Sequence, residues 1–137
     1  MRTETTKAPA AITMNRDYPG TADQAHRVRA DLLSVAAGCP AADNLILLAS
    51  ELVTNAILHS KSGRPGHTFT IRAVLYPDRY AWVEVVDQGG EWIPAGPGDE
   101  SGRGLAIVAA IAGDGNWGID GDSATRVAWF RLNWSQS

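Results

Sequence analysis

Several features that mark other classes of protein are scarce in this sequence. The 137-residue chain has one cysteine, Cys39, so it cannot form an internal disulfide or the thiol cluster of a structural zinc site. No apolar run approaches the roughly 20 residues of a membrane span, and residues 1–9 lack the apolar core of a signal peptide. The formal charge is −3, without the basic excess of nucleic-acid-binding proteins. We therefore expect a cytoplasmic protein that binds neither nucleic acid nor membranes.

The composition is that of an ordinary globular protein. Hydrophobic residues make up 45% of the chain and charged residues 20%. A chain of this length can bury one substantial core without disulfides or metals. We expect a flexible polar lead-in over residues 1–9 and a single domain over residues 10–137.

The spacing of apolar residues predicts the order of secondary structure. A capping-box pattern at Thr21–Gln24 predicts the start of the first helix, with an apolar stripe that includes Val28, Leu32 and Leu33. The predicted elements are a strand at 11–15, helices at 22–36 and 42–60, strands at 67–75 and 80–86, a helix at 104–112, and strands at 117–119 and 125–134. Grouped helices and a mostly antiparallel sheet indicate an α+β fold, a two-layer α/β sandwich with helices on one face.

The second predicted helix carries three polar residues on one side. Glu51, Asn55 and His59 fall within about 80° of one another at 100° per residue, in the same sector as two leucines. Burying such groups is costly unless each has a partner. A carboxylate that accepts a proton, one turn from an oxygen ligand for Mg²⁺, is one use of this arrangement. A solvated helix edge is equally compatible with it.

Two glycine-containing segments are candidate ligand sites. Asp87 ends an apolar strand, and Gly89 follows where a flat ring could approach an ionised acceptor. Gly102 and Gly104 open the third predicted helix, where bare amides favour an anion. No Walker A lysine follows them. Taken alone, the first segment is more typical of a simple turn than of a ligand site, and the second is equally typical of a flexible hinge.

The order of these features resembles that of a known superfamily. A helix with Glu and Asn, a strand ending in Asp-x-Gly, a glycine-rich segment entering a helix and a strand with Thr125 resemble the N, G1 and G2 boxes of the GHKL ATPases. Within that group, the segment LLASELVTNAILHS resembles the anti-sigma factor serine/threonine kinases of bacterial partner-switching systems. The resemblance covers residues 10–134 and implies a Bergerat-type ATP-binding fold.

The resemblance also implies roles for individual residues. Glu51 would be the general base, Asn55 the Mg²⁺ ligand, and Asp87 the acceptor for the adenine amino group. The remaining expected nucleotide-site residues are Gly89 under the base, Gly102, Gly104 and Leu105 around the phosphates with Arg103 as a compensating cation, Thr125 reaching adenine through water, and His59 supporting the pocket.

The implied function is phosphoryl transfer from Mg-ATP to an anti-anti-sigma antagonist, with capture of a sigma factor. Such kinases commonly dimerise, and the sequence leaves a homodimer open. Two departures favour the alternative of a non-catalytic interaction module: Glu100 stands where the family often has an arginine, and the segment 91–101 is short for an ATP lid. The catalytic domain of a histidine kinase is disfavoured, because the chain leaves no room for a phospho-accepting helical hairpin.

Overall fold

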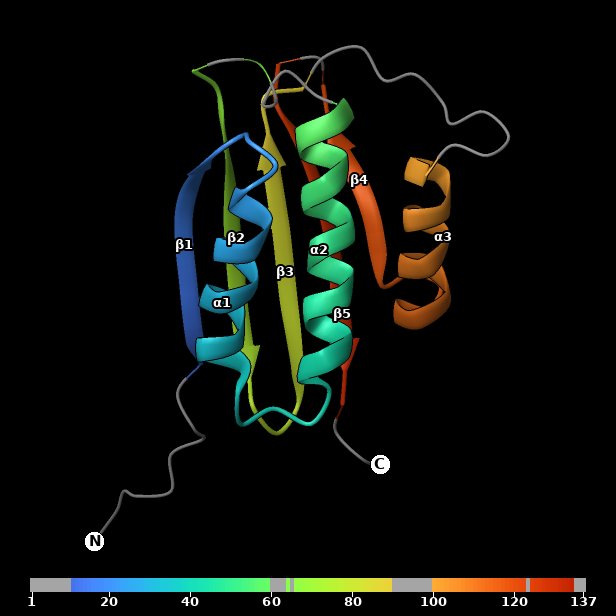
Figure 1. The fold of residues 1–137 in the computed structure, drawn as a ribbon. Coiled ribbons are helices and arrows are strands. Elements are labelled where there is room, and N and C mark those ends of the chain that lie inside the picture. Colours follow the sequence, from blue (N-terminus) through green and yellow to red (C-terminus); the bar gives the residue numbers. More distant parts are fainter. Residues whose placement is uncertain (1–10, 60–63, 65, 90–99, 123, 135–137) are drawn as a thin grey trace, which may run out of the picture.

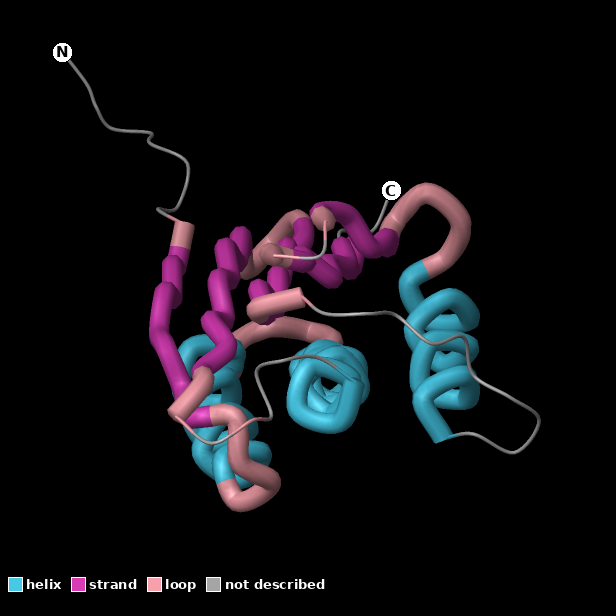
Figure 2. The backbone as a smooth tube through the Cα atoms, turned by 90° about the horizontal axis from the view of Figure 1, so that it is seen from above, coloured by secondary structure: helices cyan, strands magenta, loops and turns pink. Residues whose placement is uncertain are grey.

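One antiparallel sheet with three helices on one face makes up the fold. The computed structural model describes residues 11–59, 64, 66–89, 100–122 and 124–134. Its elements are β1 (Ile12–Pro19), α1 (Gln24–Ala36), α2 (Ala42–His59), β2 (Thr68–Tyr76), β3 (Tyr80–Asp87), α3 (Glu100–Ala112), β4 (Trp117–Gly121) and β5 (Arg126–Asn133). The strand order is β1-β2-β3-β5-β4, and each neighbouring pair is antiparallel. Figures 1 and 2 show the helices on the same side of the sheet, which confirms the predicted α+β sandwich.

The core lies between the sheet and α1 and α2. Alternate residues of β2 and β3 point towards the helices and are buried, as the period of two predicts. The predicted stripe of α2 packs against them and is also buried, through Leu45, Leu48, Leu52 and Ala56. These three elements match their predicted spans closely, so the central part of the sandwich is confirmed.

The predicted start of α1 is wrong. The helix begins at Gln24, and its N-cap residue Asp23 makes no side-chain cap hydrogen bond. The Thr21 hydroxyl, expected to cap the helix, donates to the Asp23 carboxylate at 2.5 Å. An acidic residue close to the expected cap therefore competes for the hydroxyl. Leu33 was also misplaced, because its side chain is 52% exposed while Val28 and Leu32 are buried.

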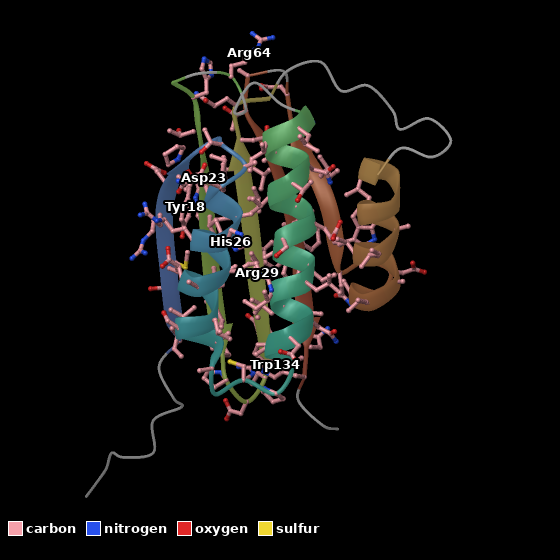
Figure 3. The ribbon with its side chains drawn as sticks, in the orientation of Figure 1. Tyr18, Asp23, His26, Arg29, Arg64 and Trp134 are labelled. Atoms are coloured by element: carbon pink, nitrogen blue, oxygen red, sulfur yellow. The ribbon has the colours of Figure 1, made fainter. Side chains whose placement is uncertain are left out.

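The first strand is longer than predicted because Tyr18 joins the core. Its ring stacks on that of Phe69 with centroids 5.5 Å apart, and its hydroxyl donates to Asp31 of α1 at 2.7 Å. Arg16 reaches the same carboxylate at 2.8 Å. These contacts fix α1 against the edge strand β1, and Figure 3 shows Tyr18 between these two elements. The hydroxyl and the guanidinium together hold the pKa of Asp31 below its ordinary value.

The third helix begins four residues earlier than predicted, at Glu100. The bare amides of a helix belong to its first four residues, here 100–103. Gly102 is among them, whereas Gly104 lies in the next turn of the helix. The prediction that both glycines open the helix is therefore wrong for Gly104.

The face of the sheet away from the helices carries aromatic side chains. Trp82 of β3 and Trp129 of β5 stack with ring centroids 4.5 Å apart. The guanidinium of Arg131 lies 4.0 Å from the centroid of the Tyr80 ring. Within the described residues, none of the helices combines the length and apolarity of a membrane span.

Candidate functional site

The candidate site lies at one end of the sandwich. The C-terminal end of α2, the end of β3 and the start of β5 lie together there, and the start of α3 lies to the side of α2 (Figure 1). On α2, Glu51 is half-buried and Asn55, one turn later, is only 5% exposed. Asn55 is thus not at a solvated helix edge, and the structure favours the buried arrangement for this side of α2.

Gly104 explains how close α3 comes to α2. A Cβ atom at position 104 would lie 2.5 Å from Oε1 of Glu51 and 3.5 Å from its carboxyl carbon. Gly104 itself is buried. A glycine in the second turn of α3 therefore makes room for the carboxylate that the sequence singles out as the candidate base.

Asp87 ends β3 in a buried position, with the residue 3% exposed. Its Oδ1 accepts the backbone N–H of Gly89 at 2.8 Å. Gly89 is itself buried and has φ of +68°, a conformation that glycine adopts without strain. The Asp-x-Gly segment is thus a turn, as its simplest interpretation predicts. Unlike an ordinary surface turn, however, it places a carboxylate inside the protein.

Arg126, a residue that the sequence analysis missed, pairs with Asp87. It is the first residue of β5 and the register partner of Asp87. Its Nε and Nη2 atoms lie 3.1 and 2.9 Å from Oδ2 of Asp87, and Arg126 is 7% exposed. The sequence feature that could have identified Arg126 is the alternation of side chains along β5. Arg126 is on the same, inward side of this strand as Ala128, Phe130 and Leu132. An arginine on that side needs a buried anion.

The Asp87–Arg126 pair sets the electrostatics of the site. Burial raises the pKa of Asp87 above its ordinary value. The Gly89 amide and the Arg126 guanidinium act in the opposite direction and stabilise the ionised form. This end of the sandwich thus holds a buried acceptor whose ionised form is stabilised by one backbone amide and one arginine.

The other predicted site residues are placed as follows. Leu105 is partly buried against the core, and Gly102 and Arg103 belong to the first turn of α3. Thr125 is exposed just before β5, where its N–H donates to Asp122 at 2.9 Å. His59 is the last residue of α2. The side chains of His59, Glu100 and Arg103 lie outside the described residues.

A groove of about 700 Å³ lies on the outer side of α1 and α2. Arg29 is placed between the two helices (Figure 3), and the exposed Leu33 and Leu47 contribute apolar surface. The groove reaches Glu51, but Asp87 is not among its lining residues. The candidate base is therefore accessible from a surface that a protein partner can reach.

The donor set fits a magnesium nucleotide. Mg²⁺ prefers oxygen ligands and takes many of them from phosphates and water, so the amide oxygen of Asn55 suits it. The described residues contain no group of three His, Cys, Asp or Glu side chains that could hold a metal ion. A buried carboxylate that accepts hydrogen bonds suits an exocyclic amine. Asn55 and Asp87 are therefore compatible with the phosphate and base ends of such a ligand.

Comparisons with known proteins identify the family. A crystal structure of the RsbU and RsbW domains of Rv1364c from Mycobacterium tuberculosis matches with a TM-score of 0.64 and 20% sequence identity. The match covers 88% of this chain and 31% of that chain, so this protein spans less than a third of its structural neighbour. The comparison with curated proteins gave no match. A family model for the histidine kinase-like ATPase domain matches residues 18–128. The chain belongs to the histidine kinase-like ATPase domain family.

Proposed function

We propose that this chain is an anti-sigma regulator kinase. It transfers the γ-phosphoryl group of Mg-ATP to a serine or threonine of an anti-anti-sigma antagonist, and it captures a sigma factor when that antagonist is phosphorylated. Family membership supports ATP binding, and the RsbW domain of the structural neighbour supports this type of regulator. Partner switching of this kind would take place in the cytoplasm.

The observation that carries the proposal is the placement of Glu51 and Asn55. They lie one turn apart on α2, with Glu51 beside Gly104 of α3. The C-terminal end of α2 lies at the same end of the sandwich as the end of β3 (Figure 1). In this proposal α2 supplies the proton acceptor and the oxygen ligand, and the end of β3 supplies the buried acceptor for the base. That combination is what transfer from a magnesium nucleotide requires.

Each side chain has a defined task in this mechanism. Asp87 accepts a hydrogen bond from the adenine amino group, and the amide oxygen of Asn55 would hold Mg²⁺. The hydroxyl oxygen of the antagonist forms a bond to the γ-phosphorus while the bond to the β–γ bridging oxygen breaks. Glu51 takes the hydroxyl proton, and ADP leaves. Mg²⁺, when bound, neutralises charge on the phosphates.

Calorimetry and labelling test the proposal together. The chain is titrated with ATP and with a non-hydrolysable analogue, with and without Mg²⁺, and is then incubated with labelled ATP and candidate antagonists. We expect Glu51→Ala to keep Mg-ATP binding and lose transfer, and Asn55→Ala to lose the Mg²⁺ dependence of binding. Thr54→Ala, at an exposed position of α2, is the matched control. Absence of nucleotide binding in every condition would disprove the proposal.

A second candidate function is a binding module that does not transfer phosphate. The observation that favours it is the Asp87 carboxylate, whose two oxygens already accept hydrogen bonds from Gly89 and Arg126. In this case the wild type and Glu51→Ala would bind the same partner equally well, and neither would label it from ATP.

A further inference from the structure

We propose that Arg126 is a positioning residue that makes Asp87 selective for an amino-purine. Arg126 holds Oδ2 of Asp87 with two N–H donors, so that Oδ1 is left to accept a hydrogen bond from the base. This inference rests on the proposed function, because it assumes that Asp87 faces the base of a nucleotide. To the proposed nucleotide site it adds Arg126 and a preference for bases that carry an exocyclic amino group.

The hydrogen bonds around Asp87 carry the argument. An ionised carboxylate has about four acceptor positions, two on each oxygen. Nε and Nη2 of Arg126 use both positions on Oδ2, at 3.1 and 2.9 Å, and the Gly89 N–H uses one on Oδ1 at 2.8 Å. Among the described residues, these bonds leave one acceptor position, on Oδ1. A single acceptor suits one exocyclic N–H.

Burial and charge make this acceptor selective. The Asp87 and Arg126 side chains are 2% and 8% exposed, so the pair is screened little by solvent. An ionised acceptor attracts the 6-amino group of adenine and repels the 6-keto oxygen of guanine or hypoxanthine. Burial favours the protonated acid and raises the pKa of Asp87, and the Gly89 amide and Arg126 both act against it, so the loss of Arg126 should raise that pKa further.

The neighbouring elements add few ionisable groups. Of the elements packed on β3, β5 contributes Arg126, whose guanidinium binds Asp87, and α2 contributes the half-buried Glu51. Arg72 of β2 lies on the opposite face, 3.6 Å from Glu84. The charge state of Asp87 should therefore respond to Arg126 more than to any other cation of these elements.

ATP and inosine triphosphate form the test pair, because their bases differ at the 6-position. Calorimetric titrations compare the wild type with Arg126→Met, Arg126→Lys and the control Arg131→Met, which changes an arginine of the same strand that faces the other side of the sheet. We expect Arg126→Met to lose roughly tenfold or more of the preference for ATP. Arg126→Lys should be intermediate, and Arg131→Met should match the wild type.

The pH profile separates positioning from folding. As the pH is lowered, the ATP affinity of Arg126→Met should begin to fall at a higher pH than that of the wild type. The reason is that Asp87 takes up a proton more readily without the arginine. If this variant does not fold, the double variant Asp87→Asn/Arg126→Met removes the unpaired buried charge. The double variant should fold, show no preference between the nucleotides and lack the pH shift.

Three results would overturn the inference. A folded Arg126→Met with the wild-type preference and pH profile shows that Arg126 does not act on the base. Tighter ATP binding by that variant shows that Arg126 closes the site. In both cases the wild type still binds ATP, so the proposed function stands. No ATP binding by the wild type at any pH disproves the proposed function, and this inference with it.

Discussion

At the scale of single residues, the position of the Glu51 carboxylate depends on the lack of a side chain at Gly104. A Cβ atom at this position would lie closest to Oε1, the flexible end of the glutamate, and the glutamate backbone is not among the near contacts. An added methyl group would therefore displace the carboxylate more than the helix. A general base acts only within hydrogen-bond reach of the proton that it takes.

Gly104→Ala tests this dependence. The folding free energy should change by less than about 1 kcal/mol, because the gain in helix propensity offsets the displacement of Glu51. Phosphoryl transfer should fall by a larger factor than ATP affinity does, because the added methyl group displaces the candidate base. Gly38→Ala, with open space around its Cβ, is the matched control and should leave transfer unchanged. Unchanged transfer in a folded Gly104→Ala protein would show that the contact does not position Glu51.

Residue type and local spacing could identify only part of the site. Glu51 and Asn55 are one helical turn apart, and Asp87 ends an apolar strand, so short-range patterns single them out. Arg126 is 39 residues from its partner. Their meeting depends on the register of β3 against β5, which the order of the elements does not specify. The alternation of β5 indicates that Arg126 faces inward, but its pairing with Asp87 could not be predicted from the sequence.

At the scale of elements, the interiors of helices and strands were predictable and their starts were not. The spacing of apolar residues indicates which side of an element faces the core, because core positions require apolar side chains. The start of a helix depends on local competition: Asp23 takes the Thr21 hydroxyl that was expected to cap α1. Helix α3 starts at Glu100, four residues before its predicted start, and it therefore includes Gly102 and Gly104. Glycine weakens a helix without excluding it.

The contact of β1 with α1 predicts a pH-dependent stability. Asp31 has a lowered pKa, first through the Tyr18 hydroxyl and then through Arg16. A lowered pKa stabilises the fold above the ordinary value of 3.8, and this contribution is lost as the pH falls through the lowered value. Tyr18→Phe should therefore cost about 1 kcal/mol at neutral pH, since the pair is partly exposed, and less near pH 2.5.

Chemical denaturation at both pH values measures the difference. Tyr80→Phe, on the other face of the sheet, is the control and should show no such pH dependence. An equal loss at both pH values would mean that the Tyr18 hydroxyl does not stabilise the fold through the charge of the Asp31 carboxylate.

At the scale of the whole molecule, the two faces of one sheet have different roles. The helix-covered side carries the Asp87–Arg126 pair, and the opposite side carries the stacked Trp82 and Trp129. Both pairs join β3 to β5, which are neighbours in the sheet although α3 and β4 come between them in the chain. A single core through these strands predicts that the chain unfolds as one unit.

The stacked Trp82 and Trp129 can report on nucleotide binding, although they lie on the face of the sheet opposite the candidate site. Stacked indoles give an exciton band in circular dichroism, which Trp129→Phe should remove. On heating, this band and the helical signal should be lost at the same temperature.

ATP should raise the free energy of unfolding reported by the exciton band and by the helical signal equally. At an ATP concentration of about 100 times the dissociation constant, the increase should be about 2.7 kcal/mol, because ATP binds only the folded chain. Asp87→Asn should reduce that shift, since it weakens binding by roughly 10- to 150-fold. If ATP raised the helical transition and not the exciton band, the two faces would be separate units, and the single-domain prediction would be wrong.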